Sequence, residues 1–207
     1  DGDQFYMSDE TNDESFLSIG IRDWKLGLFN SYKPEYLKKY KLYYTLEYTE
    51  GDVNYISRSR TVATKPYYKY RYEGYLAREI NEKIDIFVGY AYRYLKDESG
   101  SALGGGFYNR INKVRYMPLG IIWNFDKISL KSQYNYWLCG EHTSNAGRLS
   151  DYKDFTNDQG YGYGTDLTLN YKFENSISIY TFYRYWEVDD SNWVNCDSGD
   201  TGSIICQ

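Results

Sequence analysis

Apolar and polar residues alternate with a period of two through most of this sequence, and this feature constrains the fold more than any other. In segment 84–94, Ile, Val and Tyr occupy one face, while Asp, Gly, Ala and Arg occupy most of the other. Because successive side chains of a β-strand point to opposite faces, the pattern predicts a strand with one apolar face. The same alternation recurs in segments 39–48, 68–76, 119–125, 128–138, 166–173 and 177–186.

Composition agrees with an all-β chain. The 207 residues include 27 Tyr, 9 Phe and 5 Trp but only 3 Pro, and aromatic side chains favour pleated surfaces. This length predicts a single domain over residues 1–207. The first expected strand, near 16–29, is less regular because Ile19 and Ile21 are out of phase with Leu26 and Leu28, which predicts a bulge near 22–23.

The lengths of the connections indicate which kind of β-protein this is. Short turns are expected at 81–83, 126–127 and 174–176, and they alternate with long polar excursions at 51–63, 96–113 and 145–161. Such asymmetry is typical of the periplasmic turns and extracellular loops of outer-membrane barrels. Aliphatic residues gather toward the short turns and tyrosines toward the long loops, as in an interfacial aromatic girdle.

These patterns predict an antiparallel transmembrane up-and-down β-barrel in the outer membrane of a Gram-negative bacterium, with lipid as its surroundings. The mean hydropathy of -0.72 does not oppose this prediction, because alternating strands and polar loops hide a barrel from such averages. No segment approaches the roughly 18–20 continuous apolar residues of a membrane helix. The alternative is a soluble barrel or sandwich whose apolar face points inward.

Eight strands are visible, with the first running away from the long loops and the last running toward them. Both ends would then lie on the extracellular side, whereas bacterial barrels normally begin and end in the periplasm. We therefore expect one more strand at each end, giving ten in the complete protein. An eight-stranded barrel with a misread first strand is the alternative.

The strand faces opposite the apolar ones carry many charged residues, which we predict to line the barrel lumen. They are Lys39, Lys41, Glu47, Lys69, Arg71, Glu73, Arg93, Lys131, Asp166, Lys172 and Arg184. In a narrow barrel such residues form a salt-bridged plug. The alternative is a small porin-like pore that favours anionic solutes, because this set has more cations than anions.

The net charge of -5 comes largely from segments between strands, which argues against a nucleic-acid partner. The acidic residues Asp151, Asp154 and Asp158 are candidate Ca²⁺ ligands, although they lack a fixed ligand spacing, and solvated loop charges are the alternative. No zinc-binding spacing or phosphate-binding loop is present, and no other cofactor is predicted. The oligomeric state, monomer or homo-oligomer, is left open.

The chain has three cysteines, an odd number. We predict a disulfide between Cys196 and Cys206, which lie in one polar segment, and this pairing requires an oxidising compartment. Three unpaired thiols are the alternative.

The sole histidine, His142, lies two residues before Ser144, just beyond the expected strand 128–138. If that strand continues unbroken, both side chains share the outward face of Tyr134 and Tyr136 at the level of the lipid head groups. A serine beside an imidazole can act as a nucleophile with its base. The alternative is an ordinary polar loop.

The order His142, Thr143, Ser144, Asn145 with a following Gly147 resembles the active-site motif of two families of outer-membrane lipid hydrolases, phospholipase A and lipid A 3-O-deacylase. The resemblance implies His142 as the base, Ser144 as the nucleophile and an orienting residue on the next strand. Thr165 takes that position where the families carry Asn or Glu, and Asn157 and Asp158 are other candidates. The resemblance covers only the hairpin from Tyr134 to Phe173.

Three functions are therefore compatible with the sequence. They are a lipid esterase acting on outer-leaflet acyl esters, a small anion-favouring pore, and a structural or adhesive barrel that displays acidic loops. A fold alone does not choose among them.

Overall fold

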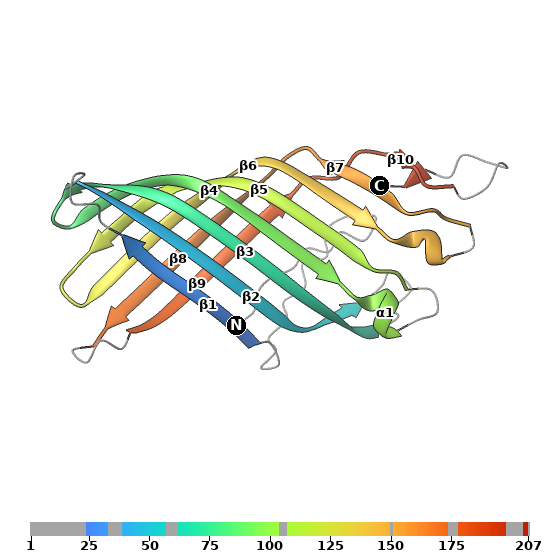
Figure 1. Cartoon of the computed structure of the whole chain (residues 1–207), viewed down its shortest axis with the longest axis horizontal. Coiled ribbons are helices and arrows are strands. Elements are labelled where there is room, and N and C mark those ends of the chain that lie inside the picture. Colours follow the sequence, from blue (N-terminus) through green and yellow to red (C-terminus); the bar gives the residue numbers. More distant parts are fainter. Residues whose placement is uncertain are drawn as a thin grey trace.

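The computed structural model describes residues 24–32, 39–56, 62–103, 107–149, 151–173, 178–197 and 205–206. Within these ranges, eight strands succeed one another in a single antiparallel sheet that curls into a half-barrel (Figure 1). The predicted all-β, up-and-down architecture is confirmed. The bulge expected near 22–23 lies outside the described residues.

The strands are long compared with those of most globular proteins. Their bounds are β1 (Trp24–Tyr32), β2 (Tyr40–Ile56), β3 (Val62–Asn81), β4 (Ile84–Asp97), β5 (Arg110–Asn124), β6 (Ile128–Ser144), β7 (Phe155–Gln159), β8 (Gly162–Lys172), β9 (Ser178–Val188), β10 (Val194–Asn195) and β11 (Ile205–Cys206). Two short helices, α1 (Ser99–Leu103) and the 3-10 turn η1 (Ala146–Arg148), complete the described elements. No described helix is long and apolar enough to cross a membrane.

The sheet order is β1-β2-β3-β4-β5-β6-β8-β9, and β7 pairs with the far part of β6. His142 on β6 is opposite Asn157 on β7, and Tyr134 on β6 is opposite Thr165 on β8. β7 and β8 thus act as one strand interrupted at residues 160–161. Among the described strands, β1 and β9 each have one neighbour and do not pair with each other.

The strands extend farther than the sequence predicts. β2 continues to Ile56 and β3 begins at Val62, so most of the excursion expected at 51–63 is strand. Segment 96–113 contains α1 and the start of β5, and segment 145–161 contains η1 and β7. The long-loop end is therefore mainly an extension of the sheet, because backbone pairing continues past the end of the apolar alternation.

The two faces of the sheet differ in the way that the alternation predicts. On β3, Tyr70, Tyr72 and Leu76 are 43–50% exposed on the outer face, while Lys69 and Arg71 on the inner face are 3% exposed. Outer positions on β4, β6 and β8 are likewise apolar and exposed. They include Ile86, Val88, Tyr90, Tyr134, Tyr136, Leu138, Leu167 and Leu169. The polar face is thus the buried one, the reverse of a soluble barrel.

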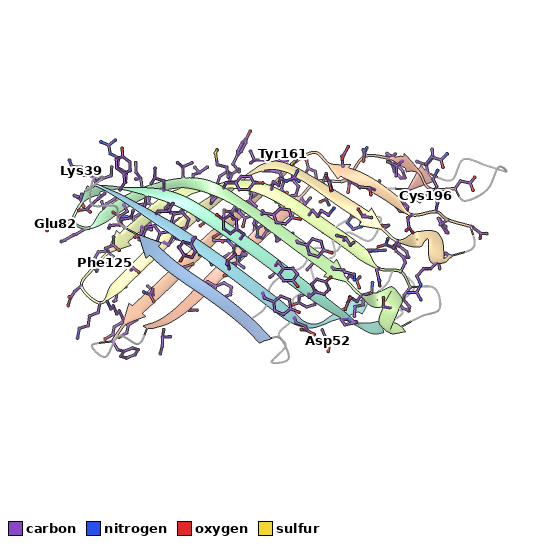
Figure 2. The ribbon with its side chains drawn as sticks, in the orientation of Figure 1. Lys39, Asp52, Glu82, Phe125, Tyr161 and Cys196 are labelled. Atoms are coloured by element: carbon purple, nitrogen blue, oxygen red, sulfur yellow. A yellow bond between two sulfur atoms is a disulfide. The ribbon has the colours of Figure 1, made fainter. Side chains whose placement is uncertain are left out.

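The ends of the half-barrel also differ. Lys39, Glu82 and Phe125 lie at the short-turn end, and Cys196 lies near the opposite end (Figure 2). The small hairpin β10–β11 lies beside β7 at that second end, and Asn157 of β7 donates a hydrogen bond to the Cys206 carbonyl of β11. We call β7, β10, β11 and η1 the loop-end lobe.

Candidate functional site

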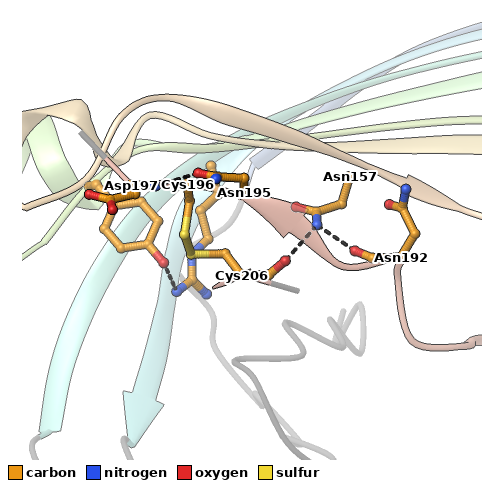
Figure 3. Close-up of a disulfide and its surroundings, with 8 residues drawn as sticks. Asn157, Asn192, Asn195, Cys196, Asp197 and Cys206 are labelled. Atoms are coloured by element: carbon orange, nitrogen blue, oxygen red, sulfur yellow. Dashed lines mark hydrogen bonds between the residues drawn. A yellow bond between two sulfur atoms is a disulfide. The ribbon is translucent and has the colours of Figure 1, made fainter. Parts of the chain in front are cut away.

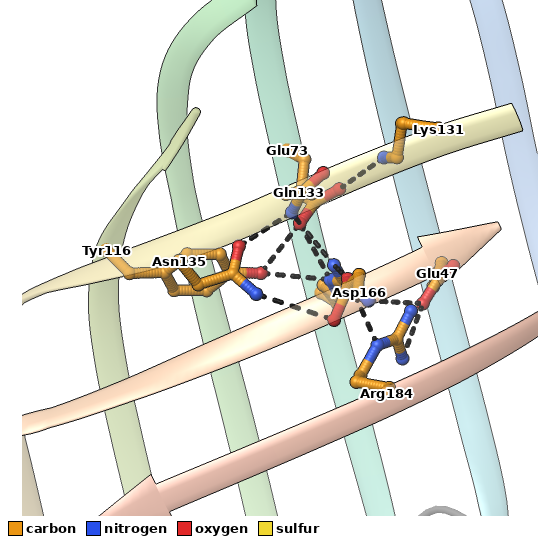
Figure 4. Close-up of polar contacts among 9 residues, drawn as sticks. Glu47, Glu73, Tyr116, Lys131, Gln133, Asn135, Asp166 and Arg184 are labelled. Atoms are coloured by element: carbon orange, nitrogen blue, oxygen red, sulfur yellow. Dashed lines mark hydrogen bonds and ion pairs between the residues drawn. The ribbon is translucent and has the colours of Figure 1, made fainter. Parts of the chain in front are cut away.

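A network of charged, amide and phenol side chains crosses the inside of the curled sheet (Figure 4). We call it the interior network. Its members are Glu47, Arg71, Glu73, Tyr116, Lys131, Gln133, Asn135, Asp166 and Arg184, from strands β2, β3, β5, β6, β8 and β9.

Arg71 lies at the centre of the interior network. Its guanidinium donates to Glu73, to the Tyr116 hydroxyl at 2.9 Å and to Asp166 Oδ2 at 2.5 Å. Arg71 is on β3 and Asp166 is on β8, which are not neighbours in the sheet order. Because one side chain joins both, the network fixes the curvature of the sheet as well as its internal charge.

Each carboxylate of the network has several partners. Glu73 Oε1 accepts hydrogen bonds from Tyr116 at 2.9 Å and from Gln133 Nε2 at 3.0 Å, and Lys131 Nζ is 3.9 Å from its other oxygen. Glu73 is 3% exposed, so these partners replace the water that a buried carboxylate loses.

The second buried carboxylate, Asp166, is bound in the same way. In addition to Arg71, it accepts from Arg184 Nε at 3.3 Å and from Asn135 Nδ2 at 3.4 Å. Glu47 Oε2 lies 3.8 Å from both Arg71 Nη1 and Arg184 Nη1. The arrangement joins the sheet across its interior with paired opposite charges.

Apolar clusters adjoin the interior network. One consists of Tyr75, Ala77, Phe87 and Ile122, with Tyr43 against it. The other consists of Ala91, Val114, Tyr116, Trp137 and Trp186. Lys131 Nζ lies 5.2 Å from the centre of the Tyr75 ring, in cation–π contact between the network and the first cluster. Buried side chains of both clusters therefore flank the interior network at this level.

Most of the residues predicted to line the lumen do lie on the inner face. Lys69, Arg71 and Glu73 are 3% exposed. Arg93 packs its guanidinium 4.9 Å from the centre of the Trp186 ring, and Lys131 and Arg184 belong to the interior network.

The three remaining lysines of that set lie nearer the short turns. Lys41 Nζ is 2.9 Å from Asp85, which is 1% exposed. Lys39 lies one residue before β2 and is exposed. Lys172, which the sequence also assigned to this face, is exposed at the end of β8.

The prediction that His142 and Ser144 face outward is wrong. The β5–β6 register shifts between Arg115, paired with Cys139, and Tyr116, paired with Trp137, which leaves Leu138 as an extra residue. This bulge puts Leu138 and Cys139 both on the exposed side and reverses the alternation beyond them. His142 and Ser144 consequently share the inner face, and Ser144 is 3% exposed.

Thr165 is not brought to His142. It is exposed on β8 opposite Tyr134, eight residues along β6 from His142, or about 26 Å at roughly 3.3 Å per residue. The residue opposite His142 is Asn157, one of the alternative candidates.

Asn157 is bound to the loop-end lobe. It is fully buried, and its Nδ2 donates to the carbonyls of Asn192 at 2.6 Å and Cys206 at 3.3 Å (Figure 3). The predicted disulfide between Cys196 and Cys206 is confirmed, with a Cα–Cα distance of 5.9 Å. Cys139 is free and exposed at the bulge.

The acidic candidates for Ca²⁺ do not converge. Asp154 accepts from the Gly147 backbone N–H at 2.8 Å and from Asn145 Nδ2 at 3.2 Å, which orders η1. Within the described ranges, no group of three or more His, Cys, Asp or Glu side chains is placed to hold a metal ion.

A carboxylate also lies on the outer face at the loop end. The hydroxyls of Tyr163 and Tyr185 donate to Glu187 Oε2 at 2.6 and 2.9 Å. These hydrogen bonds, first that of Tyr163, lower the pKa of Glu187 below its ordinary value.

Sequence reasoning missed Tyr116, Gln133 and Asn135, which complete the interior network. The period-two pattern could have found them, because Gln133 and Asn135 share the parity of Lys131. Comparison with known protein families and with curated protein sequences gave no match for this chain.

Proposed function

We propose that this chain is a bilayer-spanning β-barrel protein that anchors its loop-end lobe at a membrane surface. The observation that carries the proposal is the distribution of the two faces, with apolar side chains exposed outside and charged side chains buried inside. Water would disfavour so large an exposed apolar surface, whereas a bilayer core favours it.

The apolar outer surface has the dimensions of a membrane span. On β4 the outward residues stay apolar or aromatic over 84–94, and Lys96 occupies the next outward position. A tilted transmembrane strand needs about 9–11 residues. The bacterial outer membrane is the membrane in which such barrels normally occur, and it agrees with a disulfide at the loop end.

Tyrosines gather near one edge of this apolar surface, as in the aromatic girdle of a membrane protein. Tyr48, Tyr68, Tyr70 and Tyr94 on adjacent strands have ring centroids 5.0–6.1 Å apart. Tyr48 also donates to Glu50 at 2.9 Å, so its polar tip meets a charged group beyond the apolar surface. Such rings favour the boundary between lipid and water.

The buried interior network supports anchoring in preference to an open channel. The interior network and its adjoining apolar clusters use side chains that are nearly all buried. The disulfide joins β11 to Cys196, the residue after β10, and Asn157 of β7 donates a hydrogen bond to the Cys206 carbonyl. These links give the acidic loop end a defined surface. This combination supports a structural or adhesive role.

Reconstitution into lipid vesicles tests the proposal. We expect the folded chain to resist extraction by carbonate, and its strands 40–48 and 84–94 to be protected from added protease. Extraction of the folded chain by carbonate would overturn the proposal.

Passage of small anions is a second candidate, favoured by the excess of cations among the inner-face residues. It predicts discrete conductance in planar bilayers, and charge reversal at Lys69 or Arg71 would reduce its anion preference. The absence of conductance in planar bilayers would reject the pore and keep the membrane anchor as the proposed function.

The geometry does not favour the lipid-hydrolase hypothesis. Ser144 is buried on the inner face, and Thr165 is far along the sheet from His142. We expect the folded protein not to hydrolyse phospholipid esters, with or without Ca²⁺. Hydrolysis that Ser144→Ala abolishes would restore the hypothesis.

A further inference from the structure

Three cationic side chains are adjacent on the inner face, beside the interior network. Lys69 and Arg71 are two residues apart on β3, and Arg71 is directly opposite Arg93 on β4. Side chains directly opposite in an antiparallel pair lie close together, and like charges in that position repel. Arg71 is balanced by Glu73 and Asp166, but no described carboxylate forms an ion pair with Arg93.

Hydrogen-bond donors without a protein acceptor lie beside these cations. The Arg93 Nε and Trp186 Nε1 groups are buried and have no hydrogen-bond partner. They belong to one contact, because the Arg93 guanidinium lies 4.9 Å from the centre of the Trp186 ring. Thr49 Oγ1, opposite Lys69 on the next strand, is also buried without a partner. Buried donors are normally satisfied, so the two unsatisfied donors of the Arg93–Trp186 contact indicate an acceptor from outside the protein.

The charged side chains around these donors are mostly positive, which favours an acceptor that is an anion. Among the described residues that surround the donors, five cations face three carboxylates. The cations are Lys69, Arg71, Arg93, Lys131 and Arg184, and the carboxylates are Glu47, Glu73 and Asp166.

We propose that Arg93, Trp186 and the neighbouring cations bind a small tetrahedral oxyanion of the phosphate or sulfate class inside the half-barrel. A guanidinium offers several N–H donors in a fixed plane, which suits such oxygens, and the indole N–H adds a neutral donor. The inference goes beyond the membrane-anchor function and depends only on the interior.

Calorimetric titration of the full chain, folded in detergent micelles, with inorganic phosphate and separately with sulfate tests this site. We expect saturable binding at constant ionic strength. Arg93→Gln is expected to weaken it by at least about tenfold, because a charge-assisted hydrogen bond is lost. Trp186→Phe keeps an aromatic ring and removes the N–H, and it is expected to weaken binding severalfold. The control Lys96→Gln, on the outer face, is expected to bind as the wild type does.

The absence of saturable binding, or equal affinity in wild type, Arg93→Gln and Trp186→Phe, would overturn the proposal. Circular dichroism of each variant shows whether it has folded, and Trp186→Phe provides the conservative test if Arg93→Gln does not fold. The micelle experiment needs no bilayer. Phosphate binding by a chain that fails to insert into vesicles would therefore reject the anchor function and support the anion site. Insertion into vesicles without phosphate binding would support the anchor function and reject the anion site.

Discussion

The outer and inner faces of this sheet are built from the same strands and reverse the usual arrangement of a protein. The outer face exposes side chains such as Leu46, Val88 and Leu167, and the inner face buries Arg71 and Asp166. The inner face is stabilised by specific charge pairs. The outer face depends on nonspecific contact with the medium that surrounds the protein. A change on the inner face should therefore be costly in any environment, whereas the cost of a change on the outer face should depend on what surrounds the protein.

The largest effect is expected from breaking the interior network. Asp166→Asn leaves Arg71 and Arg184 buried with one carboxylate fewer, and removal of one partner from a buried ion pair costs about 3–5 kcal/mol. Denaturant unfolding in micelles measures the loss. The matched control, Asp158→Asn on the exposed side of β7, is expected to change little, and equal losses in the two variants would contradict this role of the network.

A charge on the outer face tests the environment. Val88→Arg is expected to cost about 2–4 kcal/mol in a bilayer, because the new charge enters hydrocarbon. Thr156→Arg, on the exposed side of β7 beyond the apolar surface, is the control. If the outer face met water, both substitutions would fall within about 0.5 kcal/mol of wild type.

Removal of the disulfide, which closes the β10–β11 part of the loop-end lobe, tests whether the lobe supports the sheet. The double substitution Cys196→Ala and Cys206→Ala is expected to cost the lobe about 2–3 kcal/mol by freeing a short loop in the unfolded chain. Hydrogen exchange should accelerate in β10 and β11 while β3 and β4 remain protected. Faster exchange throughout the sheet would show that the lobe supports the whole fold.

The smallest effect concerns Glu187. Since its pKa is lowered in the folded protein, the stabilisation is present above the ordinary value of 4.5 and is lost as the pH falls through the lowered value. Carboxyl NMR is expected to show Tyr163→Phe raising the pKa of Glu187 toward 4.5. Tyr161→Phe, outside this contact, is the control, and an unchanged pKa in Tyr163→Phe would contradict the assigned cause.

The alternation predicted the strands and most of their faces because a period of two is a local property of the chain. It failed at β6, where Leu138 is added to the ladder and the face changes. The sequence offers one signal there, since three apolar residues, Trp137 to Cys139, interrupt the alternation. Gly140 comes next, where an added Cβ would lie 2.4 Å from the Trp137 ring.

The partners inside the half-barrel could not be predicted in the same way. Arg71 and Asp166 are 95 residues apart and meet only because the sheet curls. Their inward direction follows from parity, but their pairing depends on the register of every strand between them. The outward orientation expected for His142 and Ser144 was wrong for a related reason, because a one-residue shift in β6 moved both side chains to the other face.

Spin labelling along β4 in lipid vesicles tests the central claim most directly. Single cysteines at positions 86–93, with Cys139 replaced by serine, would report collision with lipid-soluble oxygen and with a water-soluble nickel complex. We predict that positions 86, 88, 90 and 92 collide with oxygen and that positions 87, 89, 91 and 93 do so much less. Strong collision of the first set with the nickel complex would show that water covers the apolar face, and would contradict a membrane-spanning barrel.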